Sequence, residues 1–133
     1  MLPGMMRLVR TAVAVLVCSA GLWAHHAYAT FYNIDQRVTL KGRVASVQFT
    51  APHVMLTIET KSSGRWQAEW TNIAALAQGG VVADTVKVGD VLEIDGSPSK
   101  NAESKVVSAL CEVRRPADGW HWSRTEACPQ TIE

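Results

Sequence analysis

Hydrophobic and polar residues alternate along much of the chain after residue 37, which is the pattern of strands with one buried face. Over residues 38–50 the apolar face first holds Val38, Leu40, Gly42 and Val44, and then passes to Val47 and Phe49. A period of two that changes phase inside one strand predicts a bulge or a sharp bend. Gly42 lies within this strand, as expected where a strand coils or another backbone comes close.

Two further strands follow in quick succession. Ala51-Pro52 interrupts the first run, since proline cannot donate to a central ladder. The next strand, over residues 54–59, has its apolar residues on one face, and these are Val54, Leu56 and Ile58. Residues 61–64 (Lys-Ser-Ser-Gly) predict a hairpin turn. A third strand over residues 65–70 places Trp66, Ala68 and Trp70 on one face.

A short helix and two more strands complete the predicted domain. Thr71 or Asn72 can cap a helix over residues 73–78, which Gly79-Gly80 ends. A fourth strand is expected over residues 91–95, a turn over 96–101 and a fifth strand over 105–114, with an irregular tail after residue 116. Three strands, a helix and two strands, with a bent first strand, predict an all-β fold: a small five-stranded OB-like Greek-key barrel.

The first 24 residues differ from the rest. They contain Arg7, Arg10 and the apolar run 11–18, but no acidic residue. A basic start, a short apolar core and small residues after it indicate a secretory signal peptide, favoured to be cut after Ala24, with cuts after Ala20 and Ala29 as the alternatives. The run is too short to span a bilayer, which needs roughly 20 apolar residues; a buried N-terminal helix is the alternative. The expected organisation is a signal peptide (1–24), an N-terminal segment (25–37), the OB-like domain (38–115) and a tail (116–133).

Charge and cysteine content narrow the range of possible functions and locations. Of 13 Lys and Arg residues two lie in the leader, so the mature chain would carry 11 basic and 12 acidic residues, without a basic run. Nucleic-acid binding needs clustered positive charge and is therefore disfavoured. Cys111 and Cys128 remain in the mature part and predict one disulfide in a periplasmic or secreted protein, which would tether the tail. Metal-binding thiolates are the alternative, but no familiar zinc spacing results.

The order of several short motifs resembles a family of short exported bacterial proteins, known as a domain of unknown function. The matching stretches are Ala24-His25-His26, residues 38–44, Pro52-His53, Trp66 with Glu69, Asn72, Gly89-Asp90 and Gly96-Ser97-Pro98. Two positions depart from the family pattern, because Ala51 replaces an Asn and Val81 replaces a Trp. The resemblance implies an OB-like fold and export, and no activity.

Histidines are the most specific candidates for chemistry. If cleavage follows Ala24, His25 contributes both its amine and its imidazole, His26 adds a second ring and His53 adds a third. Such a nitrogen-rich ligand set suits Cu(II) best among common divalent ions, and neutral imidazole is the commonest metal-binding side chain. A solvated His-His pair at a chain terminus, and a His53 that merely begins a strand, are the alternative.

Aromatic residues offer a second candidate surface. Trp66 and Trp70 share a strand face, on which an OB-fold can stack a small polar ligand or a glycan, although core packing is the favoured interpretation. Trp120 and Trp122 flank His121 in the tail, where they cover a barrel end or contact a partner. No catalytic constellation is visible in the sequence.

These observations leave three hypotheses for function. The first is a non-enzymatic periplasmic binding module that holds copper, or another divalent metal, through His25, His26 and His53. The second is an interaction or assembly subunit that docks to an envelope protein through its sheet face and Trp-rich tail. The third is binding of a small polar ligand or glycan on Trp66 and Trp70.

Overall fold

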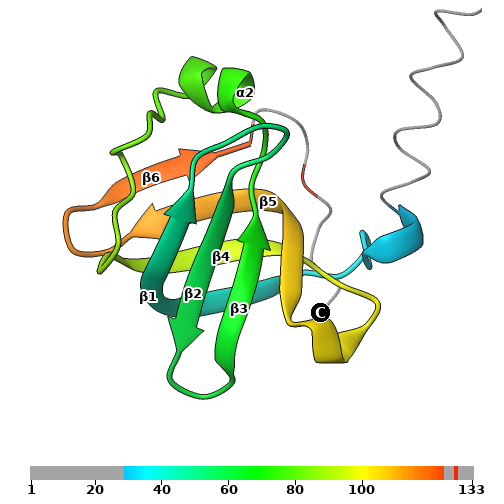
Figure 1. Cartoon of the computed structure of the whole chain (residues 1–133). Coiled ribbons are helices and arrows are strands. Elements are labelled where there is room, and N and C mark those ends of the chain that lie inside the picture. Colours follow the sequence, from blue (N-terminus) through cyan, green and yellow to red (C-terminus); the bar gives the residue numbers. More distant parts are fainter. Residues whose placement is uncertain (1–28, 125–127, 129–133) are drawn as a thin grey trace, which may run out of the picture. The chain divides into compact units, whose positions relative to one another are not determined.

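The computed structural model describes residues 29–124 and 128, and the domain that begins at Tyr32 is a β-barrel with one extra strand (Figure 1). Its elements are β1 (Val38–Gln48), β2 (Met55–Thr60), β3 (Gly64–Glu69), α2 (Ile73–Gln78), β4 (Val91–Pro98), a 3-10 turn (Ala102–Ser104), β5 (Val106–Arg115) and β6 (Trp120–Ser123). No helix among these residues has the length and apolar character to cross a membrane. The predicted signal peptide, His25 and His26 lie outside the described residues.

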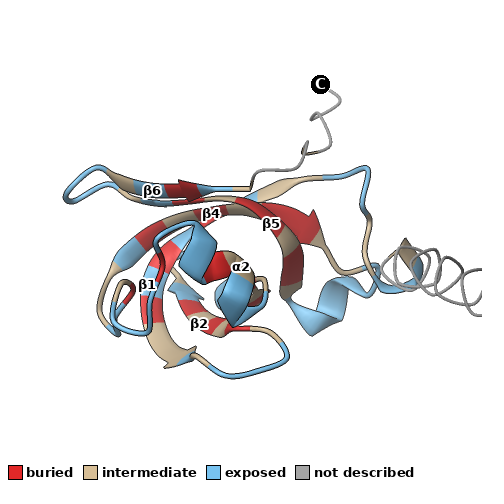
Figure 2. Cartoon of the chain, turned by 90° about the horizontal axis from the view of Figure 1, so that it is seen from above, coloured by how far each residue is buried: buried red, intermediate tan, exposed pale blue. Residues whose placement is uncertain are grey.

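Five strands close into the predicted OB-like barrel. The sheet order is β3-β2-β1-β4-β5-β6, and β3 also pairs with β5 in parallel, which closes the ring of β1 to β5. The helix between β3 and β4 lies over one end of this ring (Figure 2). Asn72 caps it by accepting a hydrogen bond from the Ala75 amide at 2.9 Å, and Leu76 is the fully buried residue of the helix.

The first strand pairs with two different neighbours and bends between them. The bend coincides with the predicted bulge and with Gly42. The strand pairs with β4 over residues 38–43 and with β2 over residues 42–48, with a bulge between Val44 and Ser46. A Cβ added at Gly42 would lie 2.4 Å from the carbonyl oxygen of Glu59 and 2.7 Å from Ile58 Cγ2. Only glycine fits where the two strands approach this closely.

The apolar faces predicted from the alternation form the core. Figure 2 shows buried residues recurring along the strands. The largest fully buried side chains of these elements include Leu56, Ile58, Leu76, Leu92 and Ile94. Trp70 belongs to the same core with 4% of its surface exposed, as the core-packing interpretation expects.

Two expectations about the second half of the domain are wrong. The fourth strand continues past Asp95 to Pro98, because Ser97 and Pro98 pair with Ser108 and Val107 after a register shift. The tail is not irregular throughout, since residues 120–123 form β6 against β5. A tight turn that ends at Gly119, with φ of 74°, brings the chain back.

The β5–β6 hairpin is held by aromatic and ionic contacts. The rings of Trp122 and Trp70 meet edge to face with centroids 5.2 Å apart, so Trp122 covers the core. Arg115 donates to Asp90 at 2.8 Å and to the Thr85 carbonyl at 2.7 Å, and lies 5.2 Å from the Trp120 ring centroid. These contacts fix the loop after α2 against the hairpin.

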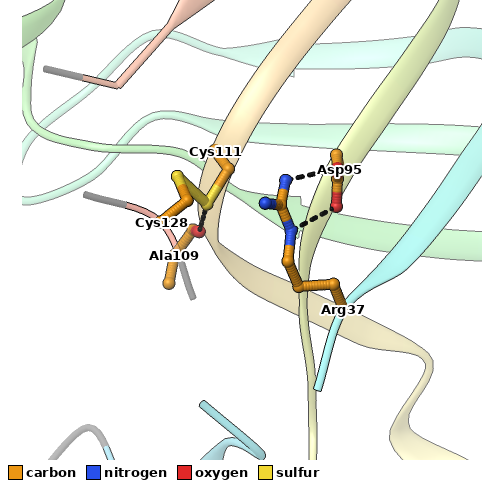
Figure 3. The surroundings of a disulfide bond; sticks show 5 residues. All are labelled: Arg37, Asp95, Ala109, Cys111 and Cys128. Atoms are coloured by element: carbon orange, nitrogen blue, oxygen red, sulfur yellow. Dashed lines mark hydrogen bonds and ion pairs between the residues drawn. A yellow bond between two sulfur atoms is a disulfide. The ribbon is translucent and has the colours of Figure 1, made fainter. Parts of the chain in front are cut away.

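The predicted disulfide joins Cys111 of β5 to Cys128 (Figure 3). The two Cα atoms lie 5.9 Å apart, and 17 positions separate the residues in sequence. Nearby, Arg37 forms a two-pronged ion pair with Asp95 of β4, with Nε to Oδ1 at 2.9 Å. This pair fastens the segment before β1 to the barrel.

Gly42→Ala tests the bend in β1. We expect it to lower the free energy of unfolding by about 3 kcal/mol or more, because the new methyl group meets backbone that cannot move aside. Gly64→Ala is the control: Gly64 has φ of 76° but only ordinary contacts, so about 1 kcal/mol is expected. Urea unfolding measures both, and equal losses would contradict the close approach at Gly42.

Cys128→Ala tests the contribution of the disulfide while leaving the buried Cys111 side chain in place. A loop of this size predicts a loss of about 3 kcal/mol in unfolding free energy, mainly through the unfolded chain. Thiol reduction of the unaltered protein should reproduce the same loss in urea unfolding. A loss below about 1 kcal/mol would show that the tether contributes little.

Candidate functional site

A carboxylate with three hydrogen-bond donors is the most distinctive polar feature of the barrel. Glu69, the last residue of β3, accepts from His53 Nδ1 at 2.7 Å through Oε1. Its Oε2 accepts from the hydroxyls of Tyr32 and Ser108, each at 2.9 Å. We call these four residues the Glu69 cluster.

Each member of the Glu69 cluster comes from a different part of the fold. The parallel register of β3 and β5 pairs Ala68 with Val107, which places Ser108 beside Glu69. Tyr32 is positioned by a bridge to Ser99, just after β4. The pairing of β2 with β3 extends one residue before Met55, because the carbonyl of Val54 accepts from the Trp70 amide at 2.8 Å. His53 directly precedes this extension.

The backbone beside the cluster is strained. Ala109, next to Ser108, has φ of 48°, the left-handed conformation that disfavours residues with a side chain. Such a conformation costs on the order of 1–3 kcal/mol and persists only where the surrounding structure enforces it. Here it follows directly on the buried serine that donates to Glu69.

The hydrogen bonds keep Glu69 ionised. Burial is the largest single effect and raises the pKa of Glu69, but the three hydrogen bonds and the charge of His53 together outweigh it and hold the pKa below the usual value of 4.5. An ionised carboxylate only accepts hydrogen bonds, so Nδ1 of His53 carries a hydrogen. Whenever the His53 ring is neutral, its lone pair therefore lies on Nε2.

His53 combines a fixed orientation with access to solvent. Its side chain is 40% exposed, whereas that of Glu69 is 20% exposed. A histidine that donates one ring nitrogen to a carboxylate and presents the other is the usual arrangement of a metal-binding histidine. Among residues 29–124 and 128, no three His, Cys, Asp or Glu side chains gather closely enough to hold a metal. Further ligands would have to come from elsewhere.

The tryptophans do not form a shared exposed face. Trp70 is buried, and Trp66 is half-buried, packs against the core and donates to Ser63 Oγ at 2.9 Å. In the tail, Trp122 is buried and Trp120 packs partly against the core. Of the strand pair named as a ligand platform, only Trp66 keeps a partly exposed ring.

Three members of the cluster, Glu69, Tyr32 and Ser108, were not among the candidate site residues from sequence, although Glu69 occurs in one of the family motifs. Ser108 carried a signal, because a lone serine within the apolar stretch 106–111 of a strand is a polar group in a buried setting. Tyr32 lies in a segment without a clear alternation, and its role follows only from the bridge to Ser99.

The fold and site define a small OB-like barrel with a histidine–carboxylate cluster at the C-terminal end of β3. The chain matches a family of unknown function, DUF6152, over residues 13–108, and it belongs to that family. The match includes all four residues of the Glu69 cluster, whereas Cys111, β6 and Cys128 lie beyond it. No curated protein matches the chain.

Glu69→Gln tests the electrostatics of the cluster. Because folding lowers the pKa of Glu69, its ionised form stabilises the fold above about pH 4.5, and this contribution is lost as the pH falls through the lower, folded value. The variant should therefore lose about 1–2 kcal/mol of unfolding free energy at pH 7 and progressively less below pH 4.5.

The control for this prediction is Glu59→Gln on β2, where the carboxylate forms an exposed ion pair with Arg65 at 2.6 Å. Exposed pairs contribute little, so its effect should be small at both pH values. Urea unfolding as a function of pH measures both variants. A deficit in the Glu69 variant that does not change with pH would count against the proposed ionised carboxylate.

Proposed function

We propose that the protein is an exported, non-enzymatic binding module that binds copper through His53, His25 and His26. The observation that carries the proposal is the 2.7 Å contact between His53 Nδ1 and Glu69. It fixes the ring, leaves Nε2 for a ligand, and places a negative charge behind the ring. Neutral imidazole on such a support suits Cu(II) among the common ions.

The path of the chain supports a contribution from the N-terminal histidines. Tyr32 contacts Glu69 directly, and His26 precedes Tyr32 by six positions. A fully extended chain covers roughly 3.5 Å per residue, so six residues reach at most about 20 Å. The length of the chain therefore does not prevent His25 and His26 from approaching His53, and cleavage after Ala24 would add the terminal amine as a ligand.

Export is the second part of the proposal. The basic and apolar leader supports passage through a secretion system to the periplasm or beyond. The disulfide between Cys111 and Cys128 is compatible with such an oxidising location.

Cu(II) titration of the protein purified from the exported fraction tests the proposal, after its intact mass has identified the N-terminus. We expect one equivalent to bind, with His53→Ala weakening binding by at least about tenfold because a ligand is lost. An added residue before His25 should weaken it too, since the amine moves away. Calorimetry and electron paramagnetic resonance provide the readout.

His121→Ala is the matched control, because His121 is an exposed histidine on β6 and outside the Glu69 cluster. It should bind Cu(II) as the unaltered protein does. Circular dichroism must show that both variants remain folded. Equal Cu(II) affinity of the His53 variant and the unaltered protein would reject the proposed site.

A further inference from the structure

A methionine shares the outer face of the barrel with His53 and Glu69. Val54 and Leu56 are both fully buried, so the alternation of the strand places His53 and Met55 on the opposite, outer face. Met55 is half-buried and is the cross-strand partner of Glu69 in the β2–β3 pairing. His53 and Met55 therefore flank the same carboxylate-bearing position.

The setting of Met55 is unusual for a residue that only fills a core. It is the sole methionine in residues 7–133. The next outward position along β2, Thr57, is polar, accepts from Ser46 Oγ at 2.8 Å and hydrogen-bonds the Gln67 amide at 3.2 Å. The outer face of β1–β3 is thus polar and internally hydrogen-bonded beside Met55. Packing against polar neighbours of this kind does not explain why residue 55 is a methionine.

A thioether is a chemically distinctive group at this position. Sulfur ligands are soft and favour Cu(I), whereas imidazole accepts either oxidation state of copper. Building on the copper site proposed above, we propose that Met55 Sδ and His53 Nε2 form a ligand pair for Cu(I). His53 then serves both ions, and Met55 makes the site able to hold the reduced one.

The strand register supports this pairing. Residues two apart on one strand face the same side of the sheet, and the His53 and Met55 side chains are long enough to turn towards a single bound ion. His53 is anchored through Nδ1, while Met55 has flexible torsions that let its sulfur adjust. A rigid imidazole and an adaptable thioether can therefore meet one soft cation.

The test uses Ag(I), a redox-stable and diamagnetic stand-in for Cu(I). The exported protein labelled with methyl-¹³C methionine and cleaved before His25 contains one methionine and gives a single methyl signal. We expect this signal to shift and saturate at one equivalent of Ag(I). Met55→Leu, which conserves volume, should lower Ag(I) affinity at least tenfold and leave Cu(II) affinity within about twofold.

The two proposals fail separately. An unmoved methyl signal, or equal Ag(I) affinity of Met55→Leu and the unaltered protein, overturns the role of Met55 whatever the Cu(II) result. Loss of Cu(II) binding in His53→Ala sustains the copper site independently of that outcome. Retained Cu(II) and Ag(I) affinity in His53→Ala overturns both.

Discussion

The bend of β1 is the constraint on which the barrel depends. One strand must pair with β4 through its first half and with β2 through its second, and it can do so only by coiling sharply. Gly42 permits the close approach of β2, and the bulge after Val44 shifts the register so that Val47 again lies inward. Without this turn the far edge of β3 would not meet β5, and the core would remain open on one side.

Closure of the barrel also creates the candidate site. The parallel contact of β3 with β5 extends over only two residue pairs, yet it places the Ser108 hydroxyl beside Glu69. A partly buried carboxylate is costly unless its oxygens are satisfied, and here donors from three separate segments satisfy it. The carboxylate in turn holds these segments together, so the same interaction stabilises the fold and orients His53.

Local pattern explains which features were predictable from sequence. Burial of one face imposes a period of two, so the strand faces, the phase change in β1 and the Asn72 cap all follow from the residues. The strand β6 was missed because four residues with only Trp120 and Trp122 as apolar positions give a weak period, although the preceding Asp118-Gly119 marks a hairpin turn. The Glu69 cluster is only partly predictable from sequence: His53 and Glu69 occur in motifs and Ser108 is a lone polar residue in an apolar stretch, whereas Tyr32 joins them through a long-range bridge that leaves no local trace.

The charge pattern of the outer surface bears on where a ligand would bind. Across β1, β4 and β5, Lys41 pairs with Glu93 at 2.8 Å, and Arg114 lies between Glu93 and Glu112 at 3.6 and 3.8 Å. Covering this face with a partner would remove water from a whole row of paired charges, a cost that weak exposed pairs do not return. At the end of β3, by contrast, one carboxylate already has three donors, the imidazole that it orients is 40% exposed, and Met55 is the cross-strand partner of Glu69. Binding a soft or borderline cation at this place removes little water from charged groups. For this reason we favour the proposed copper site over docking of a partner on the charged face.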